Sequence, residues 1–179
     1  MQKLSKKNYI KIGILGGTFD PPHKGHLHIS KIALKKLKLN KLIWAVTKKN
    51  PLKQKPYLST KARINLSKEM TKKEKKIFVR YFDDKIKSIN TFDLLNFIKK
   101  KNQNAKLFFL IGADNLAKFH KWNNWKKIPK LAKIAIFPRQ NCSIKSFNPI
   151  ASKKLNKKDF IYIKSKKINI SSSLIRKFW

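Results

Sequence analysis

Cysteine, acidic residues and long apolar runs are scarce in this sequence of 179 residues. The single cysteine, Cys142, has no partner for an intramolecular disulfide or a CxxC metal site, which excludes a disulfide framework and a zinc finger. We interpret it as a buried or incidental thiol. No apolar run approaches the roughly 18 residues of a membrane-spanning helix, and the N-terminus lacks the apolar region and cleavage site of a signal peptide. These absences predict a cytoplasmic protein without a membrane partner.

The scarcity of acidic residues gives the chain a formal charge of +37, from 45 Lys and Arg against 8 Asp and Glu. The arginines are Arg63, Arg80, Arg139 and Arg176. Proteins that read nucleic acid favour arginine, whereas the basic residues here are mostly lysine and are spread along the chain. We interpret them as a composition bias on solvated surfaces and expect no specific nucleic-acid partner. Polyanion binding is the alternative, and under both interpretations the field attracts small anions.

The apolar content bounds the number of domains. Hydrophobic residues make up 41% of the chain and aromatic residues 11%, which suffices for one sizeable core. We therefore predict a single domain over residues 1–179, with residues 1–9 as a flexible N-terminal extension. The sequence leaves open whether the chain forms a homo-oligomer.

Strand-like and helix-like segments alternate along the chain, as judged from apolar runs, helical spacing and capping residues. The predicted strands are 10–15, 41–46, 76–81, 106–111, 131–137 and 160–163. The predicted helices are 24–38, 60–71, 91–101 and 171–178. This alternation implies right-handed crossovers and a doubly wound, mainly parallel α/β sheet. Ligands of such sheets bind beyond the carboxyl ends of the strands.

The junction between the first predicted strand and helix concentrates glycine and histidine. Gly16 and Gly17 permit tight turning and close approach of the backbone to a ligand, and Gly25 lets a phosphate sit against the opening helical turn. His23 and His26 lie three residues apart, so on one helical turn they face the same side and donate to neighbouring phosphate oxygens. Two histidines around a glycine at such a junction predict a phosphate site.

Two segments far apart in the sequence carry a family resemblance. Residues 16–26, GGTFDPPHKGH, resemble the GTFDPxHxGH motif of the nucleotidyltransferase superfamily of adenylyl- and cytidylyltransferases. Residues 170–176, ISSSLIR, resemble the ISSTxIR motif of that superfamily, with Ser173 in place of the usual threonine. The resemblance implies a Rossmann-like nucleotidyltransferase fold with an ATP site to which both motifs contribute.

Three segments between these motifs resemble bacterial nicotinate-nucleotide adenylyltransferase. Residues 44–53 resemble the second strand and substrate loop of that family. Residues 90–95 resemble its (Y)TxDTL element, although asparagine and leucine replace the Tyr and the second Thr, and residues 109–122 resemble its FIIGxDxL…F…W run. The resemblance implies adenylyl transfer from ATP to nicotinate mononucleotide, which gives deamido-NAD and pyrophosphate in NAD biosynthesis.

The substrate supplies the nucleophile of this implied reaction, so alignment and charge stabilisation are sufficient for catalysis. The resemblance implies His23, His26 and Arg176 as catalytic residues, with His26 at the α-phosphate. The implied ATP-binding residues are Gly16, Gly17, Thr18, Phe19, His23, Gly25, His26, Gly112, Asp114, Ile170, Ser171, Ser172, Ser173 and Arg176. The implied acceptor-binding residues are Thr18, Lys48, Asn50, Thr91, Trp122 and Asn123. With few carboxylates available, no metal ligand is assigned, and Mg²⁺ is expected to arrive bound to ATP.

A few further residues receive roles outside these sets. Asp20 is expected to fix the motif loop, and Trp125 to lie in the core. His28 and His120 are interpreted as surface or packing residues. Asp114 has a second interpretation, as a cap of the helix that follows it.

The sequence leaves three alternative functions. A preference for nicotinamide mononucleotide is one, because an amide and a carboxylate differ by a single group. Pantetheine-phosphate adenylyltransferase is disfavoured, since that enzyme typically has threonine where this chain has His23. A nucleic-acid-binding protein is the alternative from another class, and it predicts salt-dependent binding that survives His26→Ala.

Overall fold

A six-stranded sheet forms the centre of the structure, a computed structural model that describes residues 9–138, 155–165 and 170–178. Every pair of neighbouring strands is parallel, and the strand order is β3-β2-β1-β4-β5-β6. The strands are β1 (Ile10–Gly17), β2 (Lys41–Val46), β3 (Ile77–Tyr81), β4 (Ala105–Gly112), β5 (Lys133–Phe137) and β6 (Phe160–Tyr162). This arrangement confirms the predicted doubly wound α/β fold.

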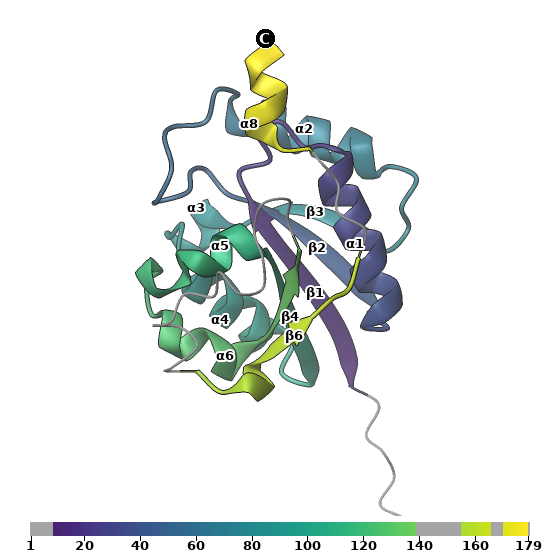
Figure 1. Ribbon diagram of the computed structural model, residues 1–179, viewed down its shortest axis with the longest axis vertical. Helices are drawn as coiled ribbons and strands as arrows, with labels where there is room; N and C mark the ends of the chain where they lie inside the picture. The colour runs from purple at the N-terminus through teal and green to yellow at the C-terminus, as the bar shows by residue number, and fades with distance from the viewer. Residues whose placement is uncertain (1–8, 139–154, 166–169, 179) are drawn as a thin grey trace, which may run out of the picture.

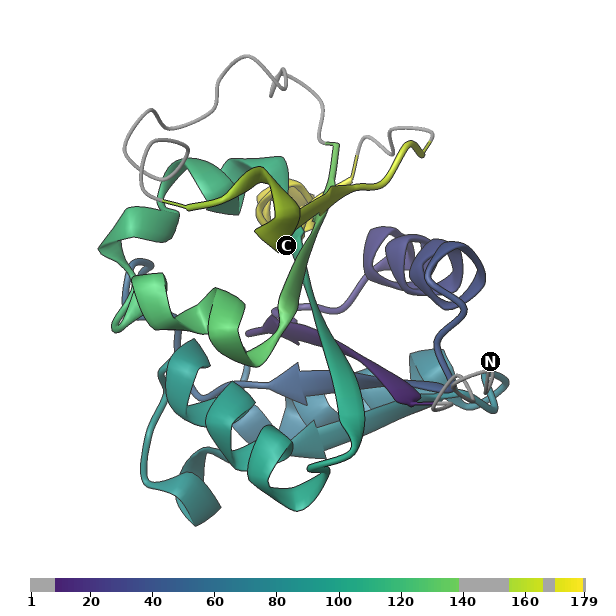
Figure 2. The same ribbon diagram turned by 90° about the horizontal axis from the view of Figure 1, so that it is seen from below.

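Helices cover both faces of the sheet (Figure 1, Figure 2). The α-helices are α1 (Lys24–Lys36), α2 (Thr60–Thr71), α3 (Asp83–Ile86), α4 (Thr91–Lys101), α5 (Ala113–Ala117), α6 (Ile128–Leu131) and α8 (Ser172–Ile175). Short 3-10 turns are η1 (Phe119–Lys121), η2 (Trp125–Lys127), η4 (Lys157–Asp159) and η5 (Arg176–Phe178). Helices α1 and α2 pack on one face, and α4, α5 and α6 pack on the other.

The central strands bury side chains on both faces, as a parallel sheet between two helical layers requires. In β1, Ile12 and Ile14 are fully buried in the core under α4, together with Leu95. The neighbouring Leu15 points the other way and joins the core under α1, together with Ala33. Alternation along one strand thus feeds two separate cores, which fixes the sheet between its helices.

The direction in which strands are added reverses between β1 and β4. After β1, the chain builds β2 and β3 outward on one side, then crosses back and places β4 on the other side of β1. The helix that follows β1 therefore packs on one face, and the helix that follows β4 packs on the opposite face. Their divergence opens a crevice at the carboxyl ends of β1 and β4, where ligands of such sheets bind.

Some boundaries differ from the predicted ones. The strand predicted over 131–137 begins at Lys133, because Leu131 ends α6, whose first turn contains Pro129. The helix predicted over 171–178 is the four-residue α8 followed by the 3-10 turn η5. Helices α3, α5 and α6 were not predicted, because four or five residues are too few to display a helical repeat.

A few predictions concern residues outside the described part of the chain. The flexible extension over 1–9 is one, apart from Tyr9, which lies next to β1, and the thiol of Cys142 is another. The single domain over 1–179 also stays a prediction. Within the described residues, no helix has both the length and the apolarity needed to cross a membrane.

Trp44 of β2 connects the sheet to the start of α1. Its indole Nε1 donates a hydrogen bond to Oγ of Ser30 at 2.8 Å, and that hydroxyl donates to the backbone oxygen of His26 at 2.7 Å. Trp44 and Ser30 are both fully buried. Because water does not reach these groups, the two bonds fix the first turns of α1 over the sheet.

We expect Ser30→Ala to lower the free energy of unfolding by about 1–3 kcal/mol, because a buried indole N–H loses its acceptor. The matched control is Ser67→Ala in α2, since Ser67 is equally buried and its Oγ has no hydrogen-bond partner among the described residues. Urea unfolding followed by tryptophan fluorescence measures both variants. An equal effect of the two substitutions would contradict the role given to the Trp44–Ser30 bond.

Candidate functional site

A cavity of about 400 Å³ lies at the crevice between the carboxyl ends of β1 and β4. Its wall takes residues from both motifs and from the segments between them. The residues predicted as site residues that line it are Gly16, Gly17, His23, Gly25, His26, Asn50, Thr91, Gly112, Trp122, Asn123 and Ile170. Residues separated by more than 150 positions therefore share one cavity, at the place that the sheet topology predicts.

The two histidines of the first motif lie against each other at the start of α1. Their ring centroids are 3.8 Å apart. Nδ1 of His23, the N-cap residue, accepts a hydrogen bond from the backbone N–H of Gly25 at 3.1 Å. Nδ1 of His26 accepts one from the backbone N–H of His23 at 3.2 Å. A neutral imidazole whose Nδ1 accepts carries its proton on Nε2, so in the neutral form each ring has its second nitrogen as a donor.

Aromatic side chains of the core pack against the His26 ring. Phe19 lies 4.8 Å from it between ring centroids and stacks in turn on Trp44 at 4.9 Å. Phe19 is 1% exposed and has a φ of 51°, in the left-handed region. The loop between β1 and α1 thus turns at Phe19, which places its ring in the core under the histidine.

The structure corrects the tight turn that was predicted at the first two glycines. Gly16 and Gly17 do not form a tight turn, because both belong to β1 and pair in register with Ala45 and Val46. Their lack of a side chain keeps the end of β1 open to the cavity. At Gly25, a Cβ would lie 2.8 Å from Nδ1 of His23, so the glycine makes room for the histidine ring.

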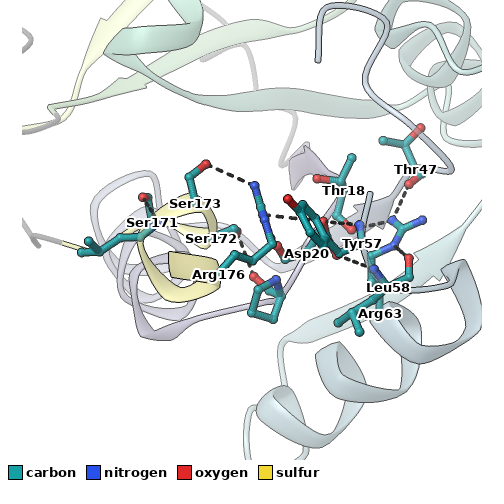
Figure 3. A network of polar contacts seen from close by, with 12 residues as sticks. Thr18, Asp20, Thr47, Tyr57, Leu58, Arg63, Ser171, Ser172, Ser173 and Arg176 are labelled. Carbon is teal, nitrogen blue, oxygen red and sulfur yellow. Dashed lines mark hydrogen bonds and ion pairs between the residues drawn. The ribbon is translucent and has the colours of Figure 1, made fainter. Parts of the chain in front are cut away.

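The second motif meets the first one beside the cavity (Figure 3). Oγ of Ser172 donates a hydrogen bond to the backbone oxygen of Pro21 at 2.9 Å. The guanidinium of Arg176 donates to the backbone oxygen of Asp20, and its Nη1 lies 3.6 Å from the Asp20 carboxylate. The peptide bond between Asp20 and Pro21 is cis. The two motifs thus form one continuous unit.

The serines of the second motif serve different purposes. Ser171 caps α8, since its Oγ accepts from the backbone N–H of Leu174 at 3.1 Å. Ser173 accepts from Nη2 of Arg176 at 3.4 Å. Neither of these serines, nor Ser172 or Arg176, belongs to the cavity wall, where Ile170 represents this motif. The motif therefore borders the cavity and supports the loop of Asp20.

An aromatic surface closes the other end of the cavity. Trp122 is half-buried, with its ring 5.3 Å from Phe119 and 5.9 Å from Phe109 between centroids. Trp125 also packs half-buried against Phe119, at the edge of the core to which it was predicted to belong. Asn123 follows Trp122 at the rim and is exposed. A flat aromatic ring with polar groups beside it fits a planar ligand.

Besides the serines and Arg176 of the second motif, four more predicted site residues lie outside the cavity wall. Thr18 presents its backbone oxygen to the guanidinium of Arg63, and Phe19 lies beneath His26. The backbone N–H of Lys48 donates to the Asp83 carboxylate at 2.7 Å. Asp114 is the second residue of α5 and does not cap it, because Gly112 occupies the N-cap position. The ligand contacts expected of these residues stay predictions.

Sequence reasoning missed several residues of the wall. His28, interpreted as a surface or packing residue, lines the cavity, and its Nε2 is buried without a hydrogen-bond partner among the described residues. His120 lies half-buried in η1, outside the wall. The other missed residues include Thr47, Lys49, Asp83, Asn115 and Lys121. The segments that resemble the family already contained Thr47, Lys49, Asn115 and Lys121, whereas Asp83 becomes a neighbour of them only through the fold.

The polar groups of the wall suit an anionic ligand. Lys49 and Lys121 contribute positive charge, and both histidines contribute donors. The one carboxylate of the wall, on Asp83, is occupied by Oγ1 of Thr47 at 2.8 Å and by the backbone N–H of Lys48. In the described ranges, no group of three or more His, Cys, Asp or Glu side chains is arranged to hold a metal.

Comparison with known proteins identifies the family. The model of the cytidylyltransferase-like family matches residues 14–178. A probable nicotinate-nucleotide adenylyltransferase of Pelagibacter ubique (strain HTCC1062) is 46% identical over 167 residues, which is 93% of this chain and 92% of the relative. This chain belongs to the nicotinate-nucleotide adenylyltransferase family. A probable nicotinate-nucleotide adenylyltransferase of Ruegeria sp. (strain TM1040) is 37% identical over 128 residues, covering 72% of this chain and 67% of that one.

Solved structures show the same fold as this family member. Nicotinic acid mononucleotide adenylyltransferase of Plasmodium falciparum, complexed with NaAD, matches with a TM-score of 0.76 and 23% identity over 95% of this chain and 84% of that chain. The same enzyme complexed with APC matches with a TM-score of 0.75. At this identity the likeness concerns the fold, and it confirms the Rossmann-like architecture.

We expect Gly25→Ala to destabilise this adenylyltransferase-family chain. Alanine normally stabilises a helix by about 1 kcal/mol more than glycine does. Here a Cβ would lie 2.8 Å from Nδ1 of His23 and 3.0 Å from a methyl group of Ile170, so one of them must move. Thermal unfolding measures the change, and Lys24→Ala, an exposed neighbour in the same turn, is the control. A higher midpoint for Gly25→Ala than for the wild type would rule out this packing.

Proposed function

We propose that this protein transfers the adenylyl group of ATP to the 5′-phosphate of nicotinate mononucleotide, giving deamido-NAD and pyrophosphate. The observation that carries the proposal is the union of both motifs beside one cavity, with His23 and His26 in its wall. Family membership supports the reaction, since the relatives that cover most of this chain are named for it.

The proposed chemistry needs no nucleophile from the protein. The 5′-phosphate of the acceptor is already anionic, attacks the α-phosphorus of ATP, and the bond to pyrophosphate breaks. The protein must align the two phosphates and stabilise the negative charge that develops at the α-phosphate. Donors held rigidly toward the cavity are the groups that this task requires.

The histidine pair supplies such donors in our proposal. Backbone N–H groups occupy Nδ1 of both rings, so Nε2 of each carries the proton. We assign His26 to the α-phosphate in the transition state and His23 to the phosphates beside it. Backbone N–H groups of Gly17 and Phe19, with Thr18, are assigned to the incoming phosphate and the ribose, because β1 ends at the cavity there.

Arg176 and the serines of the second motif are assigned to the β- and γ-phosphates of ATP. Their place beside Asp20 and Pro21 puts a positive charge at the edge of the histidine site. Arg176 is the third predicted catalytic residue, because a guanidinium there neutralises the departing pyrophosphate. Gly112 and Asp114 are assigned to the adenosine, as expected from the family motif.

The aromatic end of the cavity is assigned to the acceptor. Trp122 offers a stacking surface for the nicotinate ring, and backbone donors near Thr91 and Asn123 are assigned to its carboxylate. Lys48 and Asn50 belong to the loop at this end, and Asn50 lines the cavity.

The metal of the reaction belongs to the substrate in this proposal. Nucleotidyltransferases of this family generally use a divalent metal with ATP. We propose Mg²⁺, bound to the triphosphate, as the ion. The cytoplasmic location stays a prediction from the sequence, and the sequence leaves open whether the chain forms a homo-oligomer.

We expect His26→Ala to lower kcat/KM by about 10²–10³-fold, the usual cost of removing one fixed donor to a developing charge. Pyrophosphate release is the measurement, and circular dichroism verifies that the variant is folded. His120→Ala, which removes a half-buried imidazole outside the cavity, is the matched control and retains turnover. Full activity of His26→Ala would remove this residue from the mechanism. Salt-sensitive nucleic-acid binding in both variants, without turnover in the wild type, would instead favour the nucleic-acid alternative.

We expect a higher kcat/KM with nicotinate mononucleotide than with nicotinamide mononucleotide. A carboxylate next to backbone N–H donors and within a positive field binds more strongly than a neutral amide. The measurement supplies ATP and Mg²⁺ with each mononucleotide in turn and quantifies the dinucleotide product. Equal or reversed values would make this protein a nicotinamide-mononucleotide enzyme.

A further inference from the structure

Arg63 is the most deeply buried charged residue of the described chain, at 1% exposure, and it lies outside both motifs. It lies in the first turn of α2 and belongs to the network of polar contacts in Figure 3. Burial lowers the pKa of its guanidinium from the ordinary value, and the nearby carboxylates of Asp20 and Asp83 oppose that shift. A buried cation is costly unless all of its donors are satisfied. The acceptors that satisfy it show what it holds.

All five N–H groups of Arg63 donate to oxygen atoms of the chain. Nε donates to the backbone oxygen of Leu58 at 3.0 Å. Nη1 donates to the backbone oxygens of Thr18 at 2.6 Å and Thr47 at 2.7 Å. Nη2 donates to the backbone oxygen of Lys48 at 3.0 Å and to the side chain of Thr60. One planar group thus binds three backbone segments at the same time.

Two of those segments are the ends of one loop. Residues 47–58, which we term the acceptor loop, run from the end of β2 to the cap of α2. Arg63 holds the loop at its start, through Thr47 and Lys48, and at its end, through Leu58. Between these attachments, the loop contributes Lys49, Asn50, Pro51 and Leu52 to the cavity wall.

The third segment is the loop of the first motif. Thr18 lies between β1 and the histidines, and its backbone oxygen receives one of the shortest bonds of Arg63. Asp20 of the same loop reinforces the junction, since its carboxylate accepts from the backbone N–H groups of Tyr57 and Leu58, both at 2.9 Å. Arg63, as a donor, and Asp20, as an acceptor, therefore both hold the acceptor loop to the motif loop.

We infer that Arg63 is a positioning residue, which sets the distance between the acceptor loop and the phosphate site and thereby the alignment of the acceptor phosphate. This inference rests on the proposed function for the identity of the acceptor. It assigns to Arg63 no contact with substrate, because five protein oxygens occupy its donors. The inference also predicts that the two substrates are affected unequally. The acceptor loop, which Arg63 holds, contributes to the cavity wall, whereas Ile170 and Pro138, in another part of the wall, receive no bond from Arg63.

The test compares Arg63→Met and Arg63→Lys with Thr71→Val. Thr71 lies at the other end of α2, is also buried, and donates to the backbone oxygen of Ser67, so its substitution removes a buried bond without touching either loop. Thr60→Val is a milder variant that removes one of the five acceptors. This variant still tests the inference if Arg63→Met does not fold.

Steady-state kinetics gives the first measurement. We expect Arg63→Met to raise KM for nicotinate mononucleotide by about tenfold, with a loss in kcat/KM approaching 10²-fold, because misplacement by about 1 Å has that cost. KM for ATP rises less, because Arg63 holds the motif loop through one bond, to Thr18, and the acceptor loop through three. Arg63→Lys does not restore the acceptor KM, because an ammonium has three donors at one point and cannot span three segments. Thr60→Val shifts KM in the same direction by less, and Thr71→Val leaves both KM values unchanged.

Limited trypsin digestion under native conditions gives a measurement that does not require turnover. Lys53 is exposed within the acceptor loop and is followed by Gln54, so trypsin can cleave after it. We expect this cleavage to be faster in Arg63→Met than in the wild type, and unchanged in Thr71→Val. An unchanged acceptor KM and cleavage rate in Arg63→Met, or an equal rise in Thr71→Val, would overturn the inference. Absence of wild-type turnover would refute the proposed function alone, since the digestion still tests the attachment of the loop.

Discussion

Asp20 holds together three segments of this protein that are distant in the sequence, through the hydrogen bonds of its buried carboxylate and its contacts with Arg176. The carboxylate is 3% exposed and accepts from the backbone of Tyr57 and Leu58, while Arg176 lies against it from the C-terminal end. A chain with eight acidic residues has thus placed one of them at the centre of its site. Because water does not compete there, these bonds determine how the segments are placed relative to one another.

The contacts of Asp20 join two parts of the site that are held in place in different ways. The histidines are held by backbone N–H groups and by the ring of Phe19, so the part of the cavity that we assign to the phosphates is built on α1 and β1. The acceptor loop is exposed along most of its length and depends on its two ends for its position. Arg176 joins the two parts, since its guanidinium also lies 5.0 Å from the centre of the Tyr57 ring. Rigid donors and an attached loop suit the proposed reaction, which depends on alignment.

The positive charge of the chain acquires a more specific meaning in the structure. Most lysines are solvated, as the composition suggests, but the lysines and histidines of the cavity face the region where anions would collect. Arg63 shows the opposite use of a cation. Its charge is enclosed by backbone oxygens, so it holds backbone segments in position and contributes no direct contact to a ligand.

Much of the fold could be read from local patterns. Apolar runs and caps predicted the six strands and the main helices, and the motif at residues 16–26 predicted the position of the site. The short helices escaped prediction because their four or five residues show no periodicity. His28 was interpreted as a surface or packing residue because it lies outside both motifs, and its place in the wall depends on the packing of α1 beside the crevice.

By itself, the sequence determined the alternation of strands and helices, the family and the residue types of the phosphate site, because these depend on periodicity and on short motifs. Only the tertiary structure decided which distant groups meet. The bond from Ser172 to Pro21 spans 151 positions, and the bond from Arg63 to Thr18 spans 45. Such contacts arise from the crossovers of a parallel sheet, which bring the ends of separated strands to one edge, and no local pattern in the chain records them.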